Sequence, residues 1–250
     1  MRRYPLYIFD LDGTLYRGSQ AIPGAAEALS ELRRRGSAIR FLTNNSSQTP
    51  EFQASKLLGM GIEAAPSEVL TSGVGTAVYA RDEGLLRAFV VGEPGLIDIL
   101  GRHGVASVGS DEPADAVIVG ICRTLTYEWI NQALQQILRG ARFVATNPDV
   151  TYPMEGDRIV PGAGAVVAAV QTCSGVEPVV IGKPKRMLVD MTLRFAGASS
   201  RDALVVGDRY ETDIVSGAAA GCDTLLVMTG VTKQAPPTQA SAQSLLELLD

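Results

Sequence analysis

Short apolar runs alternate with segments of helical periodicity along most of this chain. The run Leu6–Phe9 is continuous, which is typical of a strand buried on both faces of a parallel sheet. The segment 23–36 follows it with apolar residues at helical spacing and a glycine at its end, and a second apolar run then spans 39–42. The same alternation returns in residues 179–227. This order predicts an α/β fold whose core is a doubly wound parallel sheet with helices on both faces.

A second alternating segment occupies the middle of the chain. Its apolar runs cover residues 89–92, 116–120 and 143–146. We therefore expect a discontinuous core domain of residues 1–74 and 180–250, and an inserted, smaller α/β domain of residues 75–179. The tail after Thr232 has no clear apolar run, so the sequence does not fix a last strand there.

The charge and apolar content limit the partners that we expect. The chain has 22 basic and 27 acidic side chains, for a net charge of −5, and no basic cluster suited to a phosphate backbone. No apolar run approaches the length of a membrane span, and Asp10 and Asp12 interrupt the first one. We expect a cytoplasmic protein with neither a nucleic-acid nor a membrane partner.

Acidic residues follow two of the predicted strands. Asp10 and Asp12 come directly after Leu6–Phe9, and an extended backbone would point both side chains the same way. Two neighbouring carboxylates repel each other, and hard oxygen ligands of this kind favour Mg²⁺. A solvated Asp-Gly turn is the alternative. Asp208 and Asp213 form a second pair after 203–206, with helix capping as the alternative.

Two further strand ends carry polar residues. Lys183 follows 179–181 at an expected helix start, where a cation opposes the helix dipole and a compensating anion is a reasonable expectation. Thr43 and Asn44 follow 39–42 and offer a hydroxyl and an amide, although such residues also form ordinary turns. Each loop alone is a weak signal, and the four together are a specific one.

These four groups resemble, in order, the four motifs of the haloacid dehalogenase superfamily. The short spacing between the first two motifs and the long segment before Lys183 resemble the type of this superfamily with a C2 cap domain. Residues 145–149 and 161–164 are similar to the NagD-like and 4-nitrophenylphosphatase-like branch. The motifs are Asp10-Leu11-Asp12-Gly13-Thr14, Thr43-Asn44, Lys183-Pro184 and Gly207-Asp208 with Thr212-Asp213.

The resemblance implies a Rossmann-like core and a Mg²⁺-dependent phosphatase acting on a small phosphate monoester. In such an enzyme Asp10 would be the nucleophile and form an aspartyl-phosphate, and Asp12 the general acid and base. The metal would be held by Asp10, the main-chain carbonyl of Asp12, and Asp208, with Asp213 further away. The expected phosphate-binding residues are Lys183, Thr43 and Asn44, and the expected leaving-group contacts are Asn147 and Asp149.

Other functions remain open at this point. A non-catalytic phospho-ligand binding protein or a phosphotransferase could share the fold. Nucleotides, sugar phosphates and glycerol phosphates all fit the resemblance, which also allows a homodimer.

Overall fold

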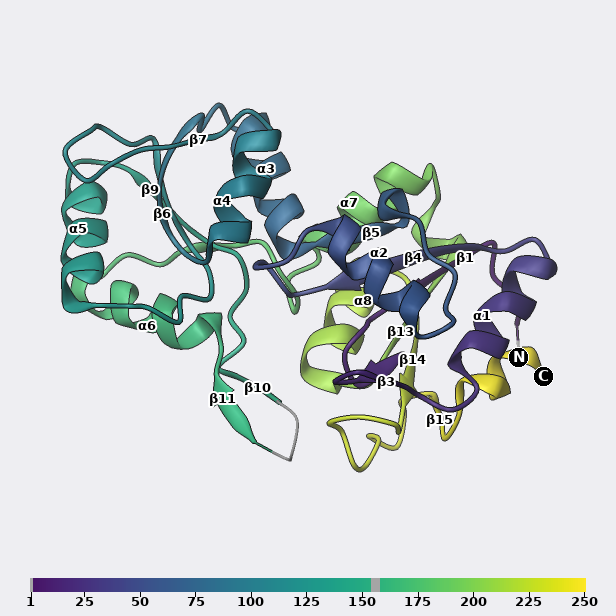
Figure 1. The fold of residues 1–250 in the computed structure, drawn as a ribbon. Helices are drawn as coiled ribbons and strands as arrows, with labels where there is room; N and C mark the ends of the chain where they lie inside the picture. Colours follow the sequence, from purple (N-terminus) through teal and green to yellow (C-terminus); the bar gives the residue numbers. More distant parts are fainter. Residues whose placement is uncertain (1, 154–157) are drawn as a thin grey trace. The chain divides into compact units, whose positions relative to one another are not determined.

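The computed structural model describes residues 2–153 and 158–250, and the chain divides into two compact units (Figure 1). The first unit comprises Met1–Thr43, Pro50–Leu70 and Lys183–Asp250, and the second comprises Asn44–Thr49 and Thr71–Gly182. These limits differ by a few residues from the predicted boundaries at 74/75 and 179/180, and they move residues 44–49 into the second unit.

The segment 44–49 joins the second unit because it packs on that unit's helices. Ser72 Oγ donates a hydrogen bond to the carbonyl of Asn44 at 2.6 Å. A side chain at Gly73 or Gly95 would collide with the backbone of residues 46 and 47, so these glycines allow a close approach.

The first unit is built on a six-stranded sheet in the order β15-β14-β13-β1-β4-β5. The central strand β1 pairs in parallel with β13 and β4, so that Phe9 lies beside Val206 on one side and Phe41 on the other. All four residues of β1 are buried, as its continuous apolar sequence predicts. The doubly wound parallel core is confirmed. Its strands are β1 (Leu6–Phe9), β4 (Ala38–Thr43), β5 (Val69–Thr71), β13 (Ala203–Gly207), β14 (Asp223–Val227) and β15 (Ser241–Ala242), and a short hairpin adds β2 (Tyr16–Arg17) and β3 (Gln20–Ala21).

Two edge strands of this sheet were not predicted. β5 has three residues, and β15 has two, which pair in parallel with β14. Runs this short carry no readable periodicity, so their formation depends on the neighbouring strand. The unit's helices are α1 (Ala25–Arg34), α2 (Pro50–Gly59), α7 (Met187–Ala196) and α8 (Val215–Ala219), with short helical turns at Pro66–Glu68, Ser200–Asp202, Tyr210–Ile214 and Leu245–Leu249.

The second unit contains a five-stranded sheet in the order β12-β9-β8-β6-β7, with parallel pairings throughout. Helices α5 and α6 contribute Ile137, Val166 and Val170 to its hydrophobic core. The inserted unit therefore has its own α/β core. Its elements are α3 (Ser72–Asp82), β6 (Arg87–Val91), α4 (Pro94–Arg102), β7 (Ala106–Ser107), β8 (Ala116–Val119), α5 (Tyr127–Leu138), β9 (Arg142–Ala145), the hairpin strands β10 (Thr151–Pro153) and β11 (Ile159–Pro161), α6 (Ala163–Ser174) and β12 (Val179–Val180).

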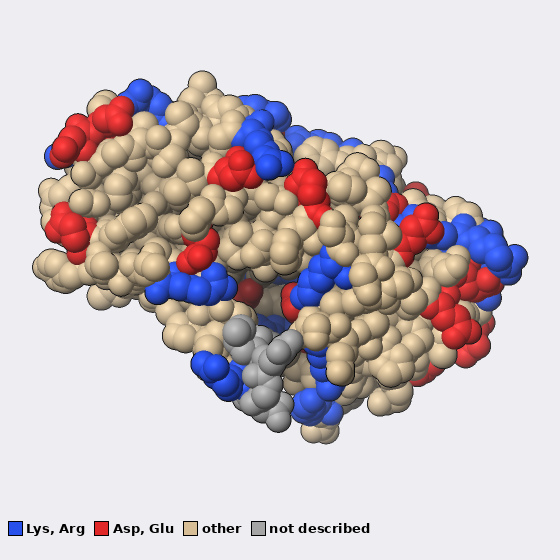
Figure 2. All heavy atoms as spheres, viewed as in Figure 1, with Lys and Arg blue, Asp and Glu red and all other residues tan. Residues whose placement is uncertain are grey.

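Basic and acidic side chains lie in small mixed groups on the face shown in Figure 2. Ion pairs at the surface of the two units include Arg34 with Glu31 and Arg142 with Glu83. Among the described helices, none has the length and apolar content needed to cross a membrane.

Candidate active site

Three strands of the first unit end at residues that were predicted to be functional. Asp10 follows β1, and its N–H donates to the carbonyl of Val206 at 2.9 Å, which ties the start of the loop to β13. Asp208 follows β13, and Thr43 is the last residue of β4. Because these strands are parallel neighbours, their carboxyl ends meet at one edge of the sheet.

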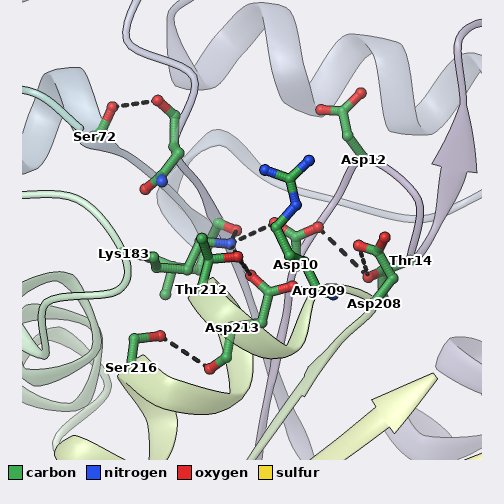
Figure 3. Close-up of polar contacts among 12 residues, drawn as sticks. Asp10, Asp12, Thr14, Ser72, Lys183, Asp208, Arg209, Thr212, Asp213 and Ser216 are labelled. Atoms are coloured by element: carbon green, nitrogen blue, oxygen red, sulfur yellow. Dashed lines mark hydrogen bonds and ion pairs between the residues drawn. The ribbon is translucent and has the colours of Figure 1, made fainter. Parts of the chain in front are cut away.

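Four charged side chains gather at this edge (Figure 3). Lys183 Nζ lies 2.6 Å from Asp10 Oδ1 and 2.6 Å from Asp213 Oδ1, and both contacts are ion pairs. The carboxylates of Asp10, Asp208 and Asp213 each offer an oxygen atom within 4.8 Å of the others. Lys183, Asp208 and Asp213 are buried. We call these four residues the acidic cluster.

Burial and mutual repulsion raise the pKa of Asp10 and of Asp208. Burial raises the pKa of Asp10 well above its usual range, Lys183 opposes this, and Asp213 and Asp208 add to it. Burial and the charge of Asp213 raise the pKa of Asp208 to about 6. Burial would lower the pKa of Lys183, but Asp10 and Asp213 raise it instead, so Lys183 stays charged.

Neighbouring loops fix the orientation of two of these carboxylates. Val231 N–H donates to Asp208 Oδ2 at 2.6 Å, and Arg209 N–H donates to Asp213 Oδ2 at 3.0 Å. Thr14 Oγ1 lies 3.3 Å from Asp208 Oδ1 and 3.5 Å from Asp10 Oδ2, so it bridges the two strand ends. Thr14 and Val231 were not predicted as site residues. Thr14 lies in the first quoted motif, but Val231 contributes only its backbone, which no residue type signals.

The acidic cluster fits a divalent cation. It holds three carboxylates against one ammonium group, and Asp208 retains a raised pKa in spite of the backbone hydrogen bond from Val231. Clustered carboxylate oxygens are the ligands that Mg²⁺ prefers. Both oxygens of Asp213 are engaged, by Lys183 and Arg209, and its place outside the ligands that contact the metal directly stays a prediction.

The carboxylate of Asp12 lies apart from the acidic cluster, contrary to the expectation that Asp10 and Asp12 project together (Figure 3). The extended backbone ends at Phe9, and residues 11–16 turn back on themselves through hydrogen bonds from Leu15 N and Tyr16 N to the carbonyl of Leu11. The alternation of side chains therefore stops before Asp12. Asp12 Oδ2 instead accepts a hydrogen bond from the hydroxyl of Tyr16 at 3.1 Å.

Three other predicted residues lie together in the second unit. Asn44 Nδ2 donates to Asp149 Oδ2 at 3.0 Å, and Asn147 Nδ2 donates to the carbonyl of Asn44 at 2.7 Å. Asn147 is buried. The structure thus joins Asn44, Asn147 and Asp149 in one hydrogen-bonded network, whereas Thr43 belongs to the first unit.

Two family models match the chain. The model of the haloacid dehalogenase-like hydrolases matches residues 7–106, and a second model of similar hydrolases matches residues 180–247. A curated relative, the 5'-nucleotidase YutF of Bacillus subtilis, is 40% identical over 94% of this chain and 91% of its own length.

Three solved structures extend the comparison. The p-nitrophenyl phosphatase of Archaeoglobus fulgidus is 34% identical with a TM-score of 0.91, over 98% of this chain and 97% of its own. NagD of E. coli K-12 is 33% identical with a TM-score of 0.89, and 98% of each chain is covered. The glycerol phosphate phosphatase Rv1692 of Mycobacterium tuberculosis, solved in complex with magnesium, is also 33% identical with a TM-score of 0.89, over 98% of this chain and 77% of its own.

Proposed function

This chain is a phosphatase in the NagD-like branch of the haloacid dehalogenase-like hydrolases, and we propose that it hydrolyses small phosphate monoesters through an aspartyl-phosphate on Asp10. The observation that carries the proposal is the acidic cluster at the carboxyl edge of the first sheet. It offers a largely buried carboxylate beside a fixed cation, which is what attack on a phosphorus atom and neutralisation of the phosphoryl oxygens require.

Each residue of the first unit takes the role that its surroundings suit. Asp10 is the nucleophile, and its bond to Lys183 fixes its orientation. Lys183 and Thr43 bind phosphoryl oxygens, because an ammonium group and a hydroxyl offer donors to them. Asp12 protonates the leaving oxygen and later takes a proton from the water that hydrolyses the aspartyl-phosphate. Asp12 is exposed, so a substrate can reach its carboxyl group.

Mg²⁺ is the proposed cofactor, held by Asp10, Asp208 and the main-chain carbonyl of Asp12, with Asp213 further out. When bound, the ion supplies positive charge that offsets the negative charge of the carboxylates and of the phosphoryl group. Asp208 is held for this by Val231 and Thr14, and Asp213 by Lys183 and Arg209.

The residues of the second unit have proposed roles in recognition. Asn44 binds a phosphoryl oxygen, and Asn147 and Asp149 contact the leaving group. The substrate is a small phosphorylated metabolite such as a nucleotide, a sugar phosphate or a glycerol phosphate. A cytoplasmic location and a homodimer stay predictions.

The test is the release of phosphate from a panel of small phosphomonoesters, with Mg²⁺ or with a chelator. The native chain is compared with Asp10→Asn, and with Asp202→Asn as a control at an exposed aspartate of the same unit. We expect release that needs both Mg²⁺ and Asp10 and is unaffected at Asp202. If Asp10→Asn matches the native chain, or no ester is hydrolysed, the proposal is wrong.

A further inference from the structure

A fully buried tyrosine lies directly against the proposed general acid. Tyr16 has no exposed surface, and its hydroxyl is 3.1 Å from Asp12 Oδ2. The backbones of Asp12 and Tyr16 also pair as in a single step of a parallel β-sheet, and Gly13 N–H donates to the carbonyl of Tyr16 at 2.7 Å. The loop that carries Asp12 is thus closed by the residue that contacts its carboxylate.

Helix α2 holds the tyrosine from the other side. The phenol oxygen lies 3.3 Å from Oε1 of Gln53, which is itself buried. One turn further along the helix, Lys56 Nζ lies 3.7 Å from the centre of the Tyr16 ring, at the distance of a cation–π contact. Gln53 and Lys56, from a segment far away in the sequence, therefore both contact the tyrosine that donates to Asp12 Oδ2.

The hydrogen-bond pattern decides which oxygen of Asp12 can carry a transferable proton. A phenol has one proton, and an ionised carboxylate is a stronger acceptor than an amide oxygen. The Tyr16 proton therefore points at Asp12 Oδ2 rather than at Gln53. In the ionised state Oδ2 is thus occupied, so Oδ1 is the oxygen that takes up a proton, and the protonated Asp12 that follows carries the proton there.

We propose that Tyr16, supported by Gln53 and Lys56, is a positioning residue that keeps the transferable proton of Asp12 on Oδ1. The inference rests on the proposed function. In the step concerned, Asp10 forms a bond to phosphorus, the ester P–O bond breaks, and the proton on Asp12 Oδ1 moves to the leaving oxygen, which departs as an alcohol. Tyr16 exchanges no proton in this step.

The leaving group makes the role measurable. An alkyl alkoxide is a strong base and needs the proton of Asp12, whereas 4-nitrophenolate is stable as an anion and needs it little. We measure kcat/KM with glycerol 1-phosphate and with 4-nitrophenyl phosphate. For Tyr16→Phe we expect a loss of about 10- to 100-fold with glycerol 1-phosphate and less than about threefold with 4-nitrophenyl phosphate.

Two variants serve as a control and a second probe. Tyr4 also donates its hydroxyl to a carboxylate, Asp223, at 2.8 Å, far from Asp12 in the sequence, and we expect Tyr4→Phe to leave the ratio of the two kcat/KM values unchanged. Gln53→Leu removes the amide that holds the Tyr16 hydroxyl and keeps the charge of Lys56. That charge has to stay because burial raises the pKa of Asp12 and Lys56 lowers it directly. We expect Gln53→Leu to change the ratio in the same direction by about threefold, and it decides the matter if Tyr16→Phe does not fold.

The variant Asp12→Asn separates the inference from the proposed function. We expect its kcat/KM, which reports formation of the aspartyl-phosphate, to fall far more with glycerol 1-phosphate than with 4-nitrophenyl phosphate. If kcat/KM falls equally with both esters, the acid role of Asp12 is wrong and the proposed function fails in that step. A different outcome is that Asp12→Asn discriminates between the esters while Tyr16→Phe lowers kcat/KM equally with both or with neither. In that case the positioning role of Tyr16 is overturned and the acid role of Asp12 stands.

Discussion

In the first unit, β1 and β13 each lead into an aspartate, Asp10 and Asp208, whereas in the second unit β6 and β8 each lead into a glycine, Gly92 and Gly120. Both sheets are parallel and both are covered by helices. At the end of the first, carboxylates and Lys183 crowd together. At the corresponding end of the second, a side chain on either glycine would run into Leu96, so neutral groups fill the space.

The difference shows that the parallel sheet supplies a place for chemistry and that the strand-end residues supply the chemistry itself. In the first unit the strand ends hold more negative than positive charge. In the second unit Thr146, which follows β9, donates a hydrogen bond to Ser46 Oγ at 3.2 Å, and neither residue is charged. The first edge should therefore respond strongly to changes of charge, and the second only weakly.

The largest effect should come from removing the cation of the acidic cluster. Lys183→Met leaves the buried Asp213 and the largely buried Asp10 without their ion-pair partner, which should cost about 3–5 kcal/mol of stability. The loss of a donor to the phosphoryl oxygens should also lower kcat by about 100- to 1000-fold. Thermal unfolding and phosphate release measure the two effects. Lys185→Met, at an exposed lysine two residues away, should change neither. Native-like stability and activity in Lys183→Met would contradict this account.

Mg²⁺ should stabilise the native chain, by about 2.7 kcal/mol when its free concentration is 100 times its dissociation constant. The native chain and the variant Asp208→Asn should differ in stability, and which of the two is more stable should depend on whether Mg²⁺ is present. With a chelator present, the variant should be the more stable one, because it removes the repulsion between Asp208 and Asp213 and keeps an oxygen for the Val231 N–H. With Mg²⁺ present, the native chain should be more stable. Thermal unfolding across a Mg²⁺ series measures both, and an equal rise in the two proteins would exclude Asp208 as a ligand.

The tight packing around Asp208 should be sensitive to a single methyl group. Gly13 has a φ of +89°, and an added Cβ would lie 2.5 Å from Asp208 Oδ2. Gly13→Ala should therefore displace the carboxylate and lower kcat by about 10-fold, in addition to a strain of about 1 kcal/mol or more from the left-handed backbone.

Gly61→Ala is the matched control for this experiment. Its φ is +77°, but nothing lies within 4 Å of the added Cβ. It should show the loss of stability and keep the activity. If both variants lose activity alike, backbone strain rather than displacement of Asp208 is the cause.

The sequence predicts the acidic edge well because its parts are local. A continuous apolar run followed at once by Asp10, and another followed by Gly207 and Asp208, fix both the strand and the position of its end. The parallel sheet then brings the ends together without any further information. Lys183 was predicted from the same pattern, but the strand before it, β12, pairs with β9 in the second unit, so the topology of the first sheet does not explain the ion pairs of Lys183 with Asp10 and Asp213.

The parts that the sequence did not predict depend on contacts between distant segments. The strands β5 and β15 are too short to show a period. The turn after Phe9 separates Asp12 from Asp10, and the partner that Asp12 finds instead, Tyr16, reads in the sequence as an ordinary apolar residue. In the same way, the placement of residues 44–49 with the second unit depends on close contacts with Gly73 and Gly95.

The smallest effect should come from the hydrogen-bond network of Asn44, Asn147 and Asp149 in the second unit. Asp149→Asn removes a charge but keeps an oxygen that can accept the hydrogen bond from Asn44 Nδ2, so the stability should change by less than about 1 kcal/mol. If Asp149 contacts the leaving group, the relative kcat/KM values across a panel of esters should shift by about 3- to 10-fold. Asp111→Asn, at an exposed aspartate of the same unit, should leave them unchanged. Unchanged relative values in Asp149→Asn would mean that Asp149 does not read the leaving group. If Asp149→Asn instead loses as much activity as Lys183→Met, the contrast between the two sheets disappears. A charge in the second unit would then matter to the reaction as much as one in the acidic cluster.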